Sequence, residues 1–338
     1  MPGVIEVIDG GIGNCIQDAG RFGFRHMGVA VSGSLDALLA RCANALVGNG
    51  PDCACIEIRA LGPTLGVRHG LVRVALAGDA GALLRRGDGA ALDVPAWSSI
   101  TLATQDVLEI GSLAGGTACL AVSGGIDSPL QLGSRSTYQR AMIGGIDGLP
   151  LVTGNLLPCS VHARRDYREY RAEPWRHADG PIRVIPGPQA EHFQAESLEL
   201  FLNSAYRVTP QIDRMGVRLQ GPQLAHVTPE AADIVSDGVT PGTIQVPGDG
   251  QPIILLADCQ TVGGYPKIAT VIAADVPRLA HLQPGQSIRF CAVNAQQARQ
   301  ALLEREARWA AWASGITFAL PNADALYNDP NSGWVCAD

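Results

Sequence analysis

Short apolar runs separated by glycine-rich turns are the feature that most limits the folds open to this chain. Glycine and proline are abundant, with 40 and 22 residues, and aromatic residues make up only 5%. Between residues 55 and 122, β-type runs recur about every ten positions, which is typical of a sandwich or a barrel. The pattern therefore predicts a mainly β protein with some α, and it argues against a helical bundle.

The predicted strands fall into two groups, so we expect two β-rich subdomains. The first covers residues 1–161 and contains one early helix. Residues 162–181 are highly charged and include two prolines, and we interpret them as a linker. Residues 182–293 form the second β-rich subdomain, and residues 294–338 form a C-terminal helix and tail.

Besides a short helical stretch around Asp275 to Leu282, three longer helices are predicted within this β framework. The first runs from about Leu35 to Val47, with Ser34 as its N-cap and Gly48 just past its end. The second follows Pro186-Gly-Pro and covers roughly Gln189 to Phe201. The third is an alanine-rich amphipathic helix over 295–313, with its large apolar side chains on or near one face: Leu302, Leu303, Trp309 and Trp312. The tail after Gly315 is expected to be irregular.

Charge and hydropathy exclude several classes of protein. The net charge is −7, so the chain lacks the basic footprint of a nucleic-acid binder. No apolar run reaches the roughly 20 residues that a membrane-spanning helix needs. The first residues also lack the basic and apolar regions of a secretory signal. We therefore expect a cytoplasmic protein without membrane or nucleic-acid partners.

The cysteines and histidines do not form a recognisable metal-binding pattern. The nine cysteines are scattered, and only Cys53 and Cys55 lie close together, as C-x-C without a second pair. The seven histidines are dispersed along the chain. We expect reduced thiols, as in a cytoplasm, and no metal site.

Lys267 is the single lysine among 25 Lys and Arg residues. Arginine cannot replace a lysine that must act as a compact point charge or titrate near neutrality. We interpret Lys267 as functional on this ground; the alternative is chance survival in a chain biased toward arginine.

Four polar, glycine-rich segments could carry chemistry: 17–36, 123–137, 211–216 and 236–267. Glycine lets backbone N–H groups approach a ligand closely, and such groups beside a cation bind phosphate or carboxylate oxygens. Ordinary turns in a β-rich protein are the alternative interpretation. The P-loop, H-E-x-x-H and G-x-S-x-G motifs are all absent.

Several motifs occur in the order found in a known family: Gln17-Asp-Ala-Gly-Arg-Phe-Gly, Gly28-Val-Ala-Val-Ser-Gly-Ser-Leu-Asp36, Ala43-Asn-Ala-Leu-Val-Gly-Asn49, Ser123-Gly-Gly-Ile-Asp127, Gly133-Ser-Arg-Ser-Thr137, Gln245-Val-Pro and Gly263-Gly-Tyr-Pro-Lys-Ile-Ala-Thr270. Together they resemble the allophanate hydrolase subunit 2 family of biotin-dependent carboxyltransferases. That family includes the C subunit of 5-oxoprolinase and the carboxyltransferase part of urea carboxylase. The resemblance runs from about residue 4 to residue 293 and implies a cyclophilin-like β-barrel in at least the C-terminal half.

The resemblance also implies a function and partners. We expect the C subunit of an ATP-dependent 5-oxoprolinase that opens 5-oxoproline to glutamate, and we expect it to be inactive alone. Its partners would be a B-type subunit, related to allophanate hydrolase subunit 1, and an A-type subunit, with ATP and Mg shared among them. One alternative is a carboxyltransferase component acting on urea or another amide, with biotin supplied by another chain. The other is a non-catalytic binder that antagonises a kinase inhibitor.

Site roles follow as hypotheses. Lys267 would stabilise the charge that develops on the transferred group, and Arg214 would hold the substrate carboxylate. Ser32 and Gly33, before the helix start at Ser34, form a second possible anion site. The full set comprises catalytic Lys267, Tyr265 and Asp237; substrate-binding Arg214, Gln245, Ser32, Gly33, Asp36 and His26; and ATP-binding Gly263, Gly264, Ser136 and Arg135.

Overall fold

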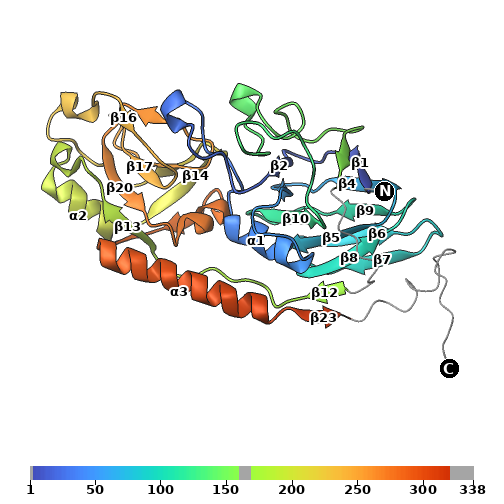
Figure 1. Ribbon diagram of the computed structural model, residues 1–338. Coiled ribbons are helices and arrows are strands. Elements are labelled where there is room, and N and C mark those ends of the chain that lie inside the picture. The colour runs from blue at the N-terminus through green and yellow to red at the C-terminus, as the bar shows by residue number, and fades with distance from the viewer. Residues whose placement is uncertain (1–2, 160–168, 320–338) are drawn as a thin grey trace.

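The computed structural model describes residues 3–159 and 169–319, and it divides into a β-sandwich and a β-barrel (Figure 1). The sandwich contains two sheets. Its six-stranded sheet has the order β11 (Leu156–Pro158), β1 (Val4–Asp9), β4 (Thr64–His69), β9 (Val107–Ile110), β6 (Ala82–Arg85), β7 (Ala91–Val94). Its seven-stranded sheet has the order β2 (Cys15–Gln17), β3 (Cys55–Ile58), β10 (Ala118–Val122), β5 (Val72–Ala77), β8 (Ser98–Leu102), β12 (Glu169–Arg171), β23 (Thr317–Ala319).

The sandwich core follows from the alternation of side chains along its strands. On β5, Val72, Val74 and Leu76 point into the core between the two sheets, where they join apolar residues of both. The intervening Ala75 and Ala77 face the opposite side and pack under the first helix. Small residues there let a helix lie close against the sheet, which creates a third layer.

That helix is α1 (Ala37–Leu46), and its start corrects the predicted N-cap. Asp36, not Ser34, is the N-cap, because its side chain accepts hydrogen bonds from Leu38 N and Leu39 N. The helix therefore begins two residues later than Leu35. Gly48 has φ +76°, as expected for a glycine just past a helix end.

The second half is a nearly closed barrel. Its eight strands have the order β21 (Ser287–Ile288), β14 (Tyr206–Ile212), β15 (Gly216–Gln220), β18 (Ile253–Leu255), β17 (Thr243–Gln245), β20 (Lys267–Val271), β13 (Ile182–Pro186), β22 (Phe290–Ala292). The two edge strands, β21 and β22, follow each other directly in the chain. A separate two-stranded ribbon pairs β16 (Asp237–Gly238) with β19 (Val262–Gly263). The mainly β fold with a C-terminal barrel is thus confirmed.

Both halves also contain short helices. The second predicted helix, Gln189 to Phe201, is a 3-10 turn, η3 (Ala190–His192), followed by α2 (Ala195–Asn203). The other 3-10 turns are η1 (Arg25–Met27), η2 (Gln139–Ala141), η4 (Pro229–Ala232) and η5 (Val276–His281). In the described parts of the chain, no helix combines the length and the apolar character that crossing a membrane requires.

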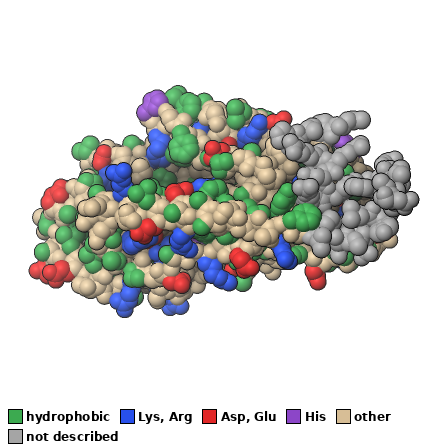
Figure 2. All heavy atoms as spheres, turned by 60° about the horizontal axis from the view of Figure 1, so that its bottom comes forward, with side chains coloured by type: hydrophobic (Ala, Val, Ile, Leu, Met, Phe, Trp, Pro, Cys, Tyr) green, Lys and Arg blue, Asp and Glu red, His purple; other side chains and the backbone are tan. Residues whose placement is uncertain are grey.

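The last helix, α3 (Ala295–Ser314), lies along both halves of the molecule (Figure 1). Ala301 packs with Ile272 of the second half, whereas Trp312 meets the ring edge of Trp97 in the first half. The sequence placed Leu303 on or near the packed apolar face. In the structure Leu303 is exposed, so this part of the prediction was wrong. Figure 2 shows acidic and basic side chains interspersed on this side, in keeping with pairs such as Arg41–Glu306 at 2.9 Å.

Two segments near the predicted linker and tail pair with each other. β12 lies within 162–181 and pairs with β8 and β23. The residues directly after Gly315 therefore include a strand, in contrast to the expected irregular tail, while 320–338 and 160–168 lie outside the described residues. The proposed domain boundaries stay predictions.

Thiol reactivity offers a first test of the packing. The eight cysteines that the structure describes are free, and burial raises the pKa of Cys15 and of Cys159 to about 12. Because the thiolate is the reactive form, a maleimide at pH 7 is expected to modify exposed Cys291 and to leave Cys15 and Cys159 intact until the protein unfolds. Peptide mass spectrometry measures each site, and fast native labelling of Cys15 would contradict this core.

Candidate active site

Lys267 opens β20 at one end of the barrel, where its ammonium group forms an ion pair with Asp237. Nζ also donates to the Gly238 carbonyl at 3.1 Å. The lysine side chain is only 6% exposed, whereas that of Asp237 is 57% exposed. The hydrogen bond from Lys267 lowers the pKa of Asp237. A buried cation is therefore linked to solvent through one exposed carboxylate.

Gln245 holds the loop that leads into Lys267. It is paired with Lys267 across β17 and β20, and its Nε2 donates to the Tyr265 carbonyl at 3.1 Å. Gln260 Nε2 donates to its Oε1 at 3.3 Å. A Cβ atom at Gly263 would lie 2.5 Å from Gln245 Nε2, so a larger residue there would displace this amide.

Tyr265 and Gly264 complete the cluster around Lys267. The Tyr265 side chain is partly open to solvent, with the residue 41% exposed. The Gly264 carbonyl accepts a hydrogen bond from Ile234 N at 2.8 Å. Neither Gly263 nor Gly264 has a positive φ. The structure thus brings six predicted residues together: Lys267, Asp237, Gln245, Gly263, Gly264 and Tyr265.

The first half reaches this end of the barrel through η1 (Figure 1). Arg25 donates to the carbonyls of Val239 and Gln260, the residues that flank the ribbon. His26, the next residue, is exposed on the same 3-10 turn. The first half therefore contacts the segments beside the ribbon through Arg25.

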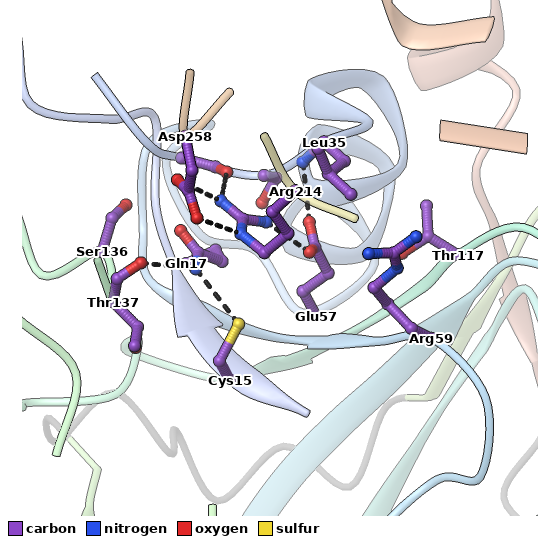
Figure 3. Close-up of polar contacts among 12 residues, drawn as sticks. Cys15, Gln17, Leu35, Glu57, Arg59, Thr117, Ser136, Thr137, Arg214 and Asp258 are labelled. Atoms are coloured by element: carbon purple, nitrogen blue, oxygen red, sulfur yellow. Dashed lines mark hydrogen bonds and ion pairs between the residues drawn. The ribbon is translucent and has the colours of Figure 1, made fainter. Parts of the chain in front are cut away.

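Arg214 occupies the junction between the two halves, in the turn between β14 and β15 (Figure 3). Its guanidinium group donates to both oxygens of Asp258, at 2.8 and 3.1 Å, and to Glu57 at 2.5 Å. A fourth bond goes to the Gly33 carbonyl at 2.7 Å. Burial opposes the charge, but Glu57 and Asp258 outweigh it and raise the pKa of Arg214. A substrate carboxylate would have to compete with two buried acids for this group.

Ser32 and Gly33 form the seam beside Arg214. Both have positive φ, at +56° and +85°, and Ser32 N donates to the Ala257 carbonyl of the second half at 3.0 Å. A Cβ at Gly33 would lie 3.0 Å from the Ala19 carbonyl oxygen. The Ser32 hydroxyl is buried and makes no hydrogen bond within the described residues.

Ser136 and Arg135 belong to a different network, centred on Asp18. Ser134 and Ser136 donate their hydroxyl protons to Asp18 Oδ1, at 2.6 and 2.5 Å, and Arg135 N donates to Oδ2 at 2.6 Å. The Arg135 side chain pairs with Asp127 at 2.7 Å. These bonds fasten loop 131–137 to loop 17–21, and they occupy the groups predicted to bind ATP.

Asp36 is likewise fully engaged. One carboxylate oxygen caps α1, and the other accepts from His177 Nε2 at 2.6 Å and His281 Nε2 at 2.8 Å. Asp36 is thus placed at the start of α1, and none of these hydrogen-bond partners belongs to the Lys267 cluster.

Comparison with known proteins shows to which family this chain is related. Residues 27–292 match the carboxyltransferase domain, subdomain A and B. This chain belongs to the carboxyltransferase family. The resemblance inferred from the motifs is confirmed, and the matched range contains every residue of the Lys267 cluster together with Arg214.

Relatives of this carboxyltransferase-family chain fall into two groups. It is 36% identical to the C subunit of 5-oxoprolinase from Escherichia coli over 90% of this chain and 96% of that protein. For the C subunit of 5-oxoprolinase from Haemophilus influenzae the identity is 34%, over 87% and 93%. The crystal structure of Kluyveromyces lactis urea carboxylase superposes with a TM-score of 0.81 at 26% identity, over 95% of this chain but only 31% of that one.

Several residues of the candidate site were not predicted from the sequence. Glu57 and Asp258 hold Arg214, and Arg25 joins the first half to the ribbon. Asp258 and Arg25 do lie in glycine-rich segments that the sequence marked as polar, but Glu57 sits within an ordinary strand. Only the fold shows that these side chains meet.

Proposed function

We propose that this chain is the C subunit of an ATP-dependent 5-oxoprolinase. Its similarity to the C subunits of two such enzymes covers nearly all of both chains, which supports this assignment. Urea carboxylase, in contrast, is about three times longer than the region that this chain matches. The partners would be an A-type subunit and a B-type subunit.

The chemistry requires activation of an unreactive lactam. Transfer of the ATP γ-phosphoryl group to the lactam oxygen releases ADP and weakens the amide resonance. Attack by water on the ring carbon then leads to cleavage of the C–N bond, and a second water releases phosphate. In sum, 5-oxoproline, ATP and two waters give glutamate, ADP and phosphate.

In this proposal Lys267 is the cation that stabilises negative charge on the transferred group. The geometry that supports this role is a buried ammonium group whose carboxylate partner is open to solvent. An anionic ligand could displace Asp237 without leaving a buried charge unpaired. Tyr265 and Gln245 border the same space and would orient the substrate.

ATP with its Mg would be held mainly by the partner subunits. Gly263 and Gly264 pack closely against Gln245 and Ile234, and Ser136 and Arg135 are engaged with Asp18 and Asp127. These groups therefore fit a phosphate cradle poorly. Lys267 is the contact that this chain would offer to the transferred phosphoryl group.

Reconstitution tests the proposal. The purified chain, mixed with A-type and B-type partner subunits, is expected to support ADP release that depends on 5-oxoproline and is matched by glutamate. Omitting this chain is the control and should abolish both products. A complex that forms but shows no 5-oxoproline-dependent ADP release would overturn the assignment.

The second candidate is carboxyl transfer to urea or another amide, favoured by the structural match to urea carboxylase. Lys267, the chain's single lysine, is buried and paired, so biotin would come from another chain. Urea-dependent consumption of a carboxybiotinyl carrier, added to the same complex, distinguishes this candidate. A complex without either reaction would favour the regulatory role.

A further inference from the structure

Two histidines and one aspartate that are far apart in sequence meet in the structure, although the sequence predicted no metal site. His177 Nε2, His281 Nε2 and an oxygen of Asp36 all lie within 4.8 Å of one another. Asp36 is fully buried, whereas the side chains of His177 and His281 are 19% and 33% exposed. The three residues come from the start of α1, the segment before β13, and the end of η5. They therefore join the sandwich, the connecting segment and the barrel.

The two oxygens of the Asp36 carboxylate have different hydrogen-bond partners. Its Oδ1 is fixed by Leu38 N and Leu39 N, so Oδ2 is held facing the two imidazoles. Burial opposes ionisation, but the hydrogen bonds from His177 and His281 outweigh it and keep the pKa of Asp36 below its usual range. Within the described residues, the ion pairs of Asp36 are those with the two histidines.

The imidazoles are also positioned by the fold. Their ring centroids are 5.1 Å apart, and the His177 ring meets the edge of Trp175. His281 lies over Gly116 of the sandwich, where a Cβ would come within 2.6 Å of His281 Nδ1. A side chain at Gly116 would displace this ring, so the glycine keeps His281 at the junction.

The arginines nearby do not compete for the same carboxylate. A cavity of about 100 Å³ borders His177 and is lined in part by Arg183, Arg278 and Arg308. Arg183 and Arg278 donate to Asp275, and Arg308 donates to the Arg176 carbonyl. Their donors are engaged away from Asp36, which leaves two nitrogens and one oxygen as a convergent ligand set.

We propose that Asp36, His177 and His281 bind a divalent transition-metal ion such as Zn²⁺, which clamps the two halves together. Two imidazoles and one carboxylate are ligands that suit Zn²⁺, with the fourth position open to water on the exposed side. Bonds of about 2.0–2.2 Å place tetrahedral ligand atoms about 3.3–3.6 Å apart. From separations of 2.6 and 2.8 Å, each partly exposed ring would move outward by roughly 0.5–1 Å.

Zn²⁺ titration of chelator-treated, reduced protein tests the site. Calorimetry and elemental analysis are expected to give one tightly bound ion per chain, and Zn²⁺ should raise the thermal midpoint because it binds only the folded form. His281→Ala and Asp36→Asn should each weaken binding by at least about tenfold. Asparagine also caps helices well, so D36N removes the ligand charge while preserving the start of α1.

His69→Ala is the matched control, since His69 is exposed at the end of β4. It should bind Zn²⁺ as the wild type does. The absorption spectrum of the Co²⁺ form should lack a thiolate charge-transfer band. No stoichiometric binding, unchanged affinity in both H281A and D36N, or a thiolate band from the free cysteines would each overturn the proposal.

Discussion

Replacing Lys267 with methionine is expected to lower 5-oxoproline-dependent ADP release by at least about a hundredfold. Removing one group that stabilises transition-state charge typically costs this much in kcat. Methionine keeps a similar length without charge, and the former partner Asp237 is 57% exposed, so no buried carboxylate is left unpaired. The rate is measured in the reconstituted complex, together with glutamate formation.

Two controls make the Lys267 result specific. Arg68→Met removes a cation from the exposed Arg68–Glu6 pair and should leave turnover and assembly unchanged. Lys267→Arg retains charge but replaces a compact ammonium with a broad guanidinium, so it should also lose most activity. If K267M turned over at the wild-type rate, Lys267 would have no catalytic role. If K267R were fully active, the inference that arginine cannot replace this single lysine would be wrong.

The strands were predictable because their signal is local. On β5, alternation of Val72, Val74 and Leu76 with Arg73, Ala75 and Ala77 indicates directly which side faces the sandwich core. The start of α1 was harder. Ser34 and Asp36 are both good caps in sequence, and the choice depends on which side chain reaches the free amides. The strand after Gly315 was missed because its partner, β12, is distant in sequence.

The candidate site was predictable to the extent that its residues share one segment. Lys267, Tyr265, Gly263 and Asp237 lie within 236–267, so the sequence brought them together. For Arg214, the sequence indicated a charged residue in a loop but not that Glu57 and Asp258 would surround it. The pairing of His177 with His281 has no local signal, because Asp36, the residue that joins them, belongs to a distant helix start.

Arg214 provides the largest expected effect on stability. In Arg214→Met, Glu57 and Asp258 would remain buried at the junction without their cation (Figure 3). Removing one partner of a buried ion pair typically costs about 3–5 kcal/mol, because the charge left behind is uncompensated. We therefore expect the free energy of unfolding, from urea titration followed by circular dichroism, to fall by about this amount.

An exposed pair supplies the comparison. Arg85 contacts Glu109 at 2.6 Å, but their side chains are 55% and 38% exposed, so Arg85→Met should cost no more than about 1 kcal/mol. Combining R214M with Glu57→Gln should restore part of the loss, since one buried charge is then removed with its partner. If Arg214 instead binds the substrate carboxylate, R214M would lose no more free energy of unfolding than R85M does. Only the KM for 5-oxoproline would then rise. The two roles of Arg214 are thus separated by whether the variant loses stability before any substrate is added.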